Sequence, residues 1–587
     1  MSRMSICVRQ MALLMFPIFS TLGLKDNTPS VYMAEFRTRP PDQRRAASIH
    51  VHVDGESGPS SVDVLTASLR ALSLLLRHSN AAQIGLILQA AFETMDEQAL
   101  WTKVDQCRWF ARKACEWTLY QYRYAIPSRL VERLLETQDA PLSTHQQKTL
   151  TKMLTTVFTS PIPLVNLSTS DIVSNLVTLV LRRVSVNPDD HILPLLVECI
   201  ASLGTHVYYS DQIQDLASEL ISRLVTVEIH GPPSLEKDDY NKRRSQAIRC
   251  LLAGLSGLIL VADAAKRDGR DKGTMSPESS FLLSSGTSSP SSQVPQRRRV
   301  SGEIWYETLN LLCDGDYAVR SDYAHTLVTY LRQEFAKRGD SGSARRPRQM
   351  TEENSPIQVN NISLMLFGDP GTRSLHAIHA YLYMLATSSS LGSVADPSPS
   401  PAYSLNGDRA SVGVSSTAPS TDPSGQSMEA TELMASRPSS SRRSAGTVIR
   451  SRKASNTQRL LECTSQKVSS ATLASLSDHA LILHVLTAIH EEVPIRGLLT
   501  GIPMLLSLDA ASQIKDESDL CVRQRAKVLK EVIARVWLVI GQVWECAELM
   551  KLAESVRVAQ RFSNLVLMHW VSYRHLPRCV VQRLFPK

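Results

Sequence analysis

The chain has 587 residues, of which 43% are hydrophobic and only 6% are aromatic. This length exceeds what one compact core can bury, so we expect several units or a continuous solenoid. The net charge is +8, yet three linker segments, 263–302, 337–350 and 436–456, together carry +13, so the rest of the chain is acidic. Nucleic-acid proteins concentrate positive charge on a folded face, and this distribution argues against that class.

The N-terminal residues contain one hydrophobic run, 11–24, which Pro17 interrupts. It is shorter than the about 20 apolar residues that span a bilayer. Arg3 and Arg9 resemble the start of a secretory signal, but no small-x-small cleavage site follows them. We therefore favour a soluble protein over a secreted one and interpret 1–61 as an irregular segment and linker.

Helical periodicity begins at residue 62 and defines three predicted helical-repeat blocks, 62–262, 303–387 and 471–587. The last block includes a long helical run that we expect to extend from 526 to 570. Two Ser/Pro-rich segments, 263–302 and 388–470, separate the blocks. They cannot bury enough apolar area to offset the entropy of ordering, so we expect disordered insertions.

The most regular helical stretch covers residues 170–225 and is predicted to form three consecutive helices. Asp171 is expected to cap the first helix. Gly204 is expected to end the second as a left-handed C′ residue, and the third begins at Ser210 or Asp211. Helices as apolar as these need neighbours on more than one side, which indicates a stacked array.

The segment 314–331 resembles the second helix of a HEAT or armadillo repeat. Asp316 is predicted to cap this helix, and Val319 to pack towards the preceding helix. Arg320 is expected to reach the capping acids of the neighbouring repeat, while Ala324 and Leu327 face the core. A single amphipathic helix can show this pattern by chance, but many further helices accompany it. We therefore predict an all-α, HEAT/armadillo-like helical-repeat solenoid with two long disordered Ser/Pro-rich insertions.

The ten cysteines form no CxxC pair and no metal-ligand spacing, which indicates a reducing compartment. Five of them lie in helical patterns and are predicted to be small core residues: Cys107, Cys199, Cys250, Cys313 and Cys546.

The sequence contains only partial matches to catalytic motifs, without the structural context that each motif needs. Ser341 lies in a GDSGS sequence typical of serine proteases, but no barrel strands accompany it. His490 is not followed by the second histidine of an HExxH zinc motif. His50 and His52 could share a metal ion, but no third metal ligand lies close to them in the sequence. No phosphate-binding glycine motif occurs. We therefore predict a protein that is not an enzyme and has no cofactor or metal.

Two linker serines follow basic residues, as basophilic kinases prefer: Ser301 and Ser455. Phosphorylation would add about −1.5 to −2 charges and weaken attraction to an anionic surface. An unmodified, solvated linker is the alternative. Five linker arginines are candidates for contact with acidic lipids: Arg297, Arg298, Arg299, Arg442 and Arg443.

Two segments carry a family resemblance: GTHVYYSDQI at 204–213 and HALILHVLTAIHEEVPIRGLLTGIPMLLSLD at 479–509. They resemble the fungal branch of the Eighty-five Requiring family, which is related to Rolling blackout in animals. The resemblance covers roughly residues 62–587, apart from the insertions. Tyr208 and Tyr209 lie in its most specific turn, where they could equally be a structural plug between repeats.

This resemblance implies a helical solenoid that acts as a scaffold at the cytoplasmic face of the plasma membrane. It would recruit a type III phosphatidylinositol 4-kinase through a tetratricopeptide-repeat adaptor and contact anionic lipids. Family members anchor through an N-terminal basic patch or acylated cysteines. The first 60 residues here lack Lys/Arg-rich helices, and Cys7 is the only candidate acylation site. The alternatives are another helical-repeat adaptor, in nuclear transport or trafficking, and a lipid-directed serine hydrolase.

Overall fold

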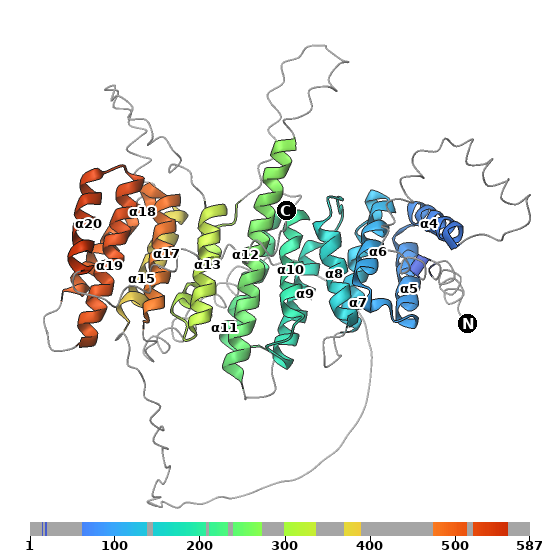
Figure 1. Cartoon of the computed structure of the whole chain (residues 1–587), viewed down its shortest axis with the longest axis horizontal. Coiled ribbons are helices and arrows are strands. Elements are labelled where there is room, and N and C mark those ends of the chain that lie inside the picture. The colour runs from blue at the N-terminus through green and yellow to red at the C-terminus, as the bar shows by residue number, and fades with distance from the viewer. Residues whose placement is uncertain are drawn as a thin grey trace, which may run out of the picture. The chain divides into compact units, whose positions relative to one another are not determined.

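The computed structural model describes residues 15, 18, 19, 61–137, 145–206, 211–232, 239–272, 299–335, 369–388, 474–513 and 520–561. Contacts divide the chain into two compact units, Met1–Leu391 with Lys467–Lys587, and Gly392–Gln466. Every residue described here belongs to the first unit. Across these residues all regular elements are helices, so the predicted all-α solenoid is confirmed (Figure 1).

The α-helices before the first insertion are α4 (Ser61–His78), α5 (Ala81–Glu97), α6 (Val104–Trp117), α7 (Ala125–Glu136), α8 (His145–Thr159), α9 (Thr169–Val186), α10 (Leu193–Ser202), α11 (Gln212–His230) and α12 (Tyr240–Lys272). Those after it are α13 (Tyr317–Gln333), α15 (Pro370–Thr387), α17 (Leu476–Glu492), α18 (Pro494–Ser512), α19 (Leu520–Val543) and α20 (Ala547–Arg561). Short 3₁₀ helices connect them: η1 (Leu100–Thr102), η2 (Tyr120–Tyr122), η3 (Leu203–His206), η4 (Gly302–Trp305) and η5 (Leu309–Cys313).

Alternate helices pack against each other and so form two layers. One layer follows α4, α6, α8, α10, α12, α13, α17 and α19, each in contact with the next. The other follows α5, α7, α9 and α11, then η4 and η5, then α15 and α18. Helix α13 contacts both α12 and α17, so packing continues between helices on either side of each insertion. This contact pattern is that of a repeat array, in which each unit buries its face against its neighbours.

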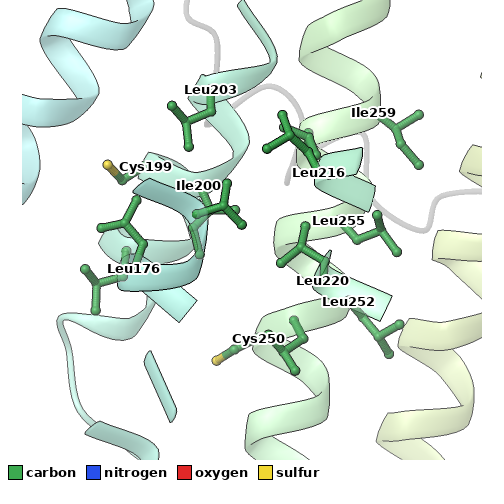
Figure 2. Packing of buried hydrophobic residues seen from close by; sticks show 14 of the residues in the cluster. Leu176, Cys199, Ile200, Leu203, Leu216, Leu220, Cys250, Leu252, Leu255 and Ile259 are labelled. Atoms are coloured by element: carbon green, nitrogen blue, oxygen red, sulfur yellow. The ribbon is translucent and has the colours of Figure 1, made fainter. Parts of the chain in front are cut away.

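The core between the layers consists mainly of aliphatic side chains. Figure 2 shows it where α9, α10, α11 and α12 meet, with Leu176, Ile200, Leu220 and Leu255 directed between the helices. Each of these four side chains is at most 1% exposed. Truncating one of them to alanine would cost about 2–5 kcal/mol, because the surrounding helices cannot close the cavity.

Two local predictions in the 170–225 stretch are wrong. Helix α9 begins after Ser168 rather than at Asp171, and Ser168 Oγ donates to Asp171 Oδ2 at 2.6 Å. Gly204 is not a left-handed C′ residue, since Gly231 is the glycine with positive φ among those described. It lies within η3, which continues the helical path of α10. The predicted start of the third helix is confirmed, because Asp211 precedes α11.

The helical run predicted from 526 to 570 contains a break, so that its described part, 526–561, lies on two helices. Helix α19 ends at Val543, and Glu545 adopts a left-handed conformation with φ of 53°. Cys546 N–H then donates to Gly541 O at 2.8 Å, which closes the helix end. Cys546 is therefore exposed and the core prediction is wrong for it, whereas Cys107, Cys199 and Cys250 are buried and Cys313 is partly buried.

The edges of two other predicted segments also differ. Helix α12 continues beyond residue 262 to Lys272, and the good helix formers Ala264, Ala265, Lys266 and Arg267 favour the first part of this extension. The N-terminal hydrophobic run contributes to the core: Phe19 is buried, with its ring centroid 5.4 Å from that of Phe110. The rest of 1–60 and most of both insertions lie outside the described residues, so the domain boundaries remain a prediction.

Candidate functional site

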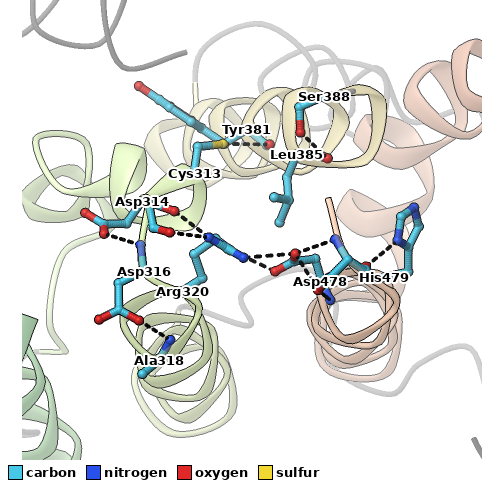
Figure 3. A network of polar contacts seen from close by, with 12 residues as sticks. Cys313, Asp314, Asp316, Ala318, Arg320, Tyr381, Leu385, Ser388, Asp478 and His479 are labelled. Atoms are coloured by element: carbon cyan, nitrogen blue, oxygen red, sulfur yellow. Dashed lines mark hydrogen bonds and ion pairs between the residues drawn. The ribbon is translucent and has the colours of Figure 1, made fainter. Parts of the chain in front are cut away.

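The predicted role of Arg320 is confirmed. Asp316 accepts from Ala318 N–H at 2.9 Å and caps α13, while Val319, Ala324 and Leu327 are buried. The Arg320 guanidinium, 5% exposed, crosses to α17 and binds both carboxylate oxygens of Asp478, at 2.7 and 3.0 Å (Figure 3). Asp478 also accepts from Ser475 N–H at 2.7 Å in the capping box of α17. The acid that Arg320 reaches is therefore a helix-capping acid of the neighbouring unit.

The same polar contacts extend to α12. Arg320 Nη1 donates to the backbone oxygen of Asp314 at 2.6 Å. The Asp314 carboxylate in turn accepts from Arg244 of α12 at 2.7 Å, with side-chain exposures of 12% for Arg244 and 4% for Asp314. We call Arg244, Asp314, Arg320 and Asp478 the Arg320 ladder. It connects α12, α13 and α17 through the core and fixes their relative register.

The segment that begins at Gly204, the first of the two that carry the family resemblance, packs tightly against α12. A Cβ at Gly204 would lie 2.6 Å from Leu258 O and 2.9 Å from Ala262 N, both backbone atoms. His206 is buried beside Phe158, with ring centroids 6.1 Å apart, and burial lowers the pKa of its imidazole to about 4. These residues therefore act in packing. The tyrosines that follow, Tyr208 and Tyr209, lie outside the described residues.

We expect Gly204→Ala to destabilise the protein by about 1–3 kcal/mol, because neither backbone atom that the new methyl group meets can move alone. Urea unfolding would measure this change. Gly85→Ala on α5 is the control, since no atom lies within 4 Å of its Cβ position. The control should gain up to about 1 kcal/mol in helix propensity. Equal stability of the two variants would contradict the close approach.

The segment 479–509 contributes one histidine of a buried pair, and helix α15 contributes the other. His379 of α15 and His490 of α17 are 2% and 1% exposed, respectively. The Nε2 atom of each lies 3.2 Å from the Cβ position of Gly501 on α18, and neither Nε2 atom makes a hydrogen bond. Burial lowers the pKa of His379 to about 3, with a further contribution from His490, and burial lowers the pKa of His490 to about 4. Both rings are therefore neutral core groups, and neither is an accessible acid or base.

Ser301 is part of the folded body. Its N–H donates to Gln214 Oε1 at 2.6 Å, and its Oγ accepts from Glu303 N–H at 3.3 Å at the start of η4. Arg299 is exposed, and its Nη1 donates to Phe335 O at 2.6 Å. The remaining candidate residues lie outside the described part of the chain: Cys7, His50, His52, Arg297, Arg298, Ser341, Arg442, Arg443 and Ser455.

Among the residues that the structure describes, no three His, Cys, Asp or Glu side chains form a group able to hold a metal ion. A cavity of about 220 Å³ lies between α5 and α7, lined by Gln89, Phe92, Glu93, Arg129, Arg133 and Glu136. Arg129 and Arg133 each bind Glu136, at 3.2 and 3.0 Å, so the charges of this cavity are largely paired internally.

By length and composition alone, the stretch Tyr240–Ala264 of α12 could cross a membrane. Its apolar side chains, among them Leu251, Leu255 and Leu258, are instead buried against the neighbouring helices. Helix α12 contacts α9, α10, α11 and α13. A central helix that is surrounded on several sides needs this composition, so we interpret it as a core helix.

Sequence reasoning did not find Asp478, the His379–His490 pair or the fixed position of Ser301. A signal existed for the first, because Ser475 and Asp478 have the spacing of a capping box just before an apolar run. No local signal distinguishes the two histidines from surface residues of an amphipathic helix.

The profile of the EFR3 protein family matches residues 114–252, which extend from α6 to α12. Protein EFR3 of Cryptococcus neoformans var. neoformans serotype D is 29% identical over 570 residues, covering 90% of this chain and 49% of its own length. Protein EFR3 of Mycosarcoma maydis is 30% identical over 408 residues, covering 59% of this chain and 37% of its own length. This chain thus spans about half the length of the first of these relatives.

Proposed function

This chain belongs to the EFR3 family, the Eighty-five Requiring family of the sequence analysis, and on that premise we propose that it is a non-enzymatic scaffold. It recruits a type III phosphatidylinositol 4-kinase complex to the plasma membrane and so supports phosphoinositide synthesis. The observation that carries the proposal is the family match over residues 114–252, which coincides with the two-layered array from α6 to α12.

The scaffold acts as a rigid platform in this proposal. Each helix of the array is fixed by neighbours in its own layer, and the Arg320 ladder adds buried ion pairs between α12, α13 and α17. Helical arrays of this kind present extended surfaces on which another protein can bind. A tetratricopeptide-repeat adaptor is the proposed partner, and the kinase binds through it.

Contact with the cytoplasmic face of the membrane is proposed to be peripheral. Clustered arginines attract anionic headgroups by about 1 kcal/mol each near the surface. Arg297, Arg298, Arg442 and Arg443 supply such charge, and Arg299 adds an exposed guanidinium beside the folded array. Acylation of Cys7 would add a lipid chain, but one chain alone gives only marginal binding, so the basic residues are needed with it.

Purification of the tagged chain from its own cells tests the scaffold role. We expect a phosphatidylinositol 4-kinase and a tetratricopeptide-repeat adaptor to co-purify, and a fluorescent fusion to mark the cell cortex. Recovery of neither partner would overturn the proposal. A nuclear rim would instead support the alternative transport adaptor, and labelling of Ser341 by a fluorophosphonate probe would support the hydrolase.

Vesicle binding tests the lipid contact separately. Replacing Arg297, Arg298, Arg442 and Arg443 with glutamine should weaken sedimentation with phosphatidylserine-containing vesicles and leave adaptor binding intact. The expected loss is about 1 kcal/mol per arginine at low salt. The control removes four exposed charges from the helical array: Arg77, Lys103, Arg112 and Lys551. If only the control variant loses binding, the membrane contact belongs to the array and the linker proposal is wrong.

A further inference from the structure

The residues Arg299–Gly302, which we call the docked segment, connect the first insertion to η4 and are held between the two layers. Val300 is 3% exposed, its N–H donates to Glu334 Oε2 at 3.1 Å, and its carbonyl accepts from Tyr330 Oη at 3.3 Å. Glu334 is itself only 1% exposed. Thus α13 and its C-cap residue Glu334 bind both polar groups of the Val300 backbone.

Helices α11 and α15 hold the same segment from other directions. Gln214 of α11 accepts the Ser301 N–H at 2.6 Å. A Cβ at Gly302 would lie 2.6 Å from Ser374 Oγ of α15, so the backbone passes directly against that helix. Beyond it, the Trp305 ring packs on Tyr330 with centroids 5.0 Å apart. The segment is therefore fixed by main-chain contacts on both sides of Ser301.

The sequence of the docked segment is one that a kinase would recognise, but its position in the fold prevents a kinase from binding it. Arg297, Arg298 and Arg299 precede Ser301 in the pattern that basophilic kinases recognise. Such kinases bind the residues around the serine in an extended form whose backbone and side chains must be free. In the docked segment the residue before Ser301 is buried, and the serine N–H is already bonded.

We propose that Ser301 is a gated modification site, which a basophilic kinase can phosphorylate only after Arg299–Gly302 leaves the array. In the reaction Ser301 Oγ attacks the γ-phosphorus of ATP, ADP leaves, and the hydroxyl proton passes to the kinase. The phosphate then disfavours return of the segment. It adds about −2 charges beside the carboxylate of Glu334 at Val300 and close to Glu303, which follows at the start of η4.

The first experiment compares phosphorylation rates. The purified full chain and a free peptide of residues 294–305 are incubated with the catalytic subunit of cyclic-AMP-dependent protein kinase and MgATP, and Ser301 is followed by mass spectrometry. We expect the chain to react at least roughly tenfold more slowly than the peptide, because only the open form is a substrate. Equal rates would overturn the proposal.

Variants of the full chain separate docking from global stability. Gln214→Ala removes the acceptor of the Ser301 N–H and should raise the Ser301 rate roughly fivefold, the effect of one ordinary hydrogen bond on the opening equilibrium. Gln89→Ala on α5 is the matched control and should leave the rate unchanged. An unchanged rate in Gln214→Ala would contradict the gate, as would an equal increase in both variants.

Hydrogen exchange tests whether phosphorylation keeps the segment out. Phosphorylation of Ser301 should abolish the protection of the Val300 and Ser301 amides, while Ser301→Ala treated with the same kinase should retain the Val300 protection. Increased protection after phosphorylation would overturn the second half of the proposal, because the phosphate would then stabilise docking. These readouts involve neither a lipid kinase nor a membrane, so they are independent of the proposed function.

Discussion

Arg320→Met is expected to lower the free energy of unfolding by about 3–5 kcal/mol, the largest loss we expect from a single polar side chain in this protein. The substitution leaves the Asp478 carboxylate, 0% exposed, without its bidentate partner, and it removes the donor to Asp314 O. Methionine keeps much of the volume, so the loss would arise from an uncompensated buried charge rather than from a cavity. Urea unfolding followed by circular dichroism measures the change.

The control for this prediction is Arg249→Met. Arg249 binds Asp322 at the same 2.7 Å distance that separates Arg320 and Asp478, but both side chains are about 40% exposed. Its loss should therefore cost no more than about 1 kcal/mol. The double variant Arg320→Met/Asp478→Leu should recover part of the lost stability, since it removes both buried charges but also the contacts of Asp478 in the capping box of α17. Similar losses for Arg320→Met and Arg249→Met would contradict the assigned role of the ladder.

The Arg320 ladder illustrates which parts of the site local sequence can predict. The pattern from Asp316 to Arg320 correctly predicts a capped helix and an arginine directed at the next unit. The partner, Asp478, lies 158 residues further along the chain, beyond the second insertion. Helical periodicity contains no information on which later helix packs beside α13, so the ion pair could not be derived from it.

Gly204 and Cys546 show the same limit at helix ends. A glycine after an apolar helix usually adopts a left-handed conformation, and Gly204 does not, because its lack of a side chain serves contact with α12 instead. The apolar pattern continues through Cys546, but the left-handed Glu545 breaks the helix just before it. For Gly204 tertiary packing against α12 determined the outcome, and for Cys546 the apolar pattern does not show where a left-handed residue ends the helix.

From the sequence, the docked segment could be recognised only as a kinase motif and not as part of the folded array. The basic residues before Ser301 predict kinase recognition, but the composition of 263–302 predicts a disordered insertion, and η4, which holds the end of the docked segment, is too short to show a helical period. These two short helices occupy the layer position between α11 and α15. Val300 and Trp305 fill the space that a longer helix would fill elsewhere in the array.

The buried histidines lead to a second large effect, a loss of stability in mild acid. The folded protein holds the pKa of His206, His484 and His490 at about 4 and that of His379 at about 3, each below the usual 6.5, and burial also lowers the pKa of His479. Between pH 6.5 and 4 the unfolded chain binds protons at these sites and the folded chain does not. Falling pH therefore favours unfolding in this window, and the stability present above pH 6.5 is lost progressively.

The expected slope near pH 5 is about 5 kcal/mol per pH unit, from up to roughly 1.4 kcal/mol for each of the four histidines whose pKa is about 3 or 4 in the folded protein. Urea midpoints measured between pH 7 and 4.5 would give this slope. His490→Gln should reduce this slope by roughly 1.4 kcal/mol per pH unit, which corresponds to one proton fewer taken up on unfolding. His78→Gln, at an exposed position, should leave the slope unchanged. A proton uptake below one in this window would mean that the histidines become charged within the fold, which requires solvent or a counter-charge at the His379–His490 contact.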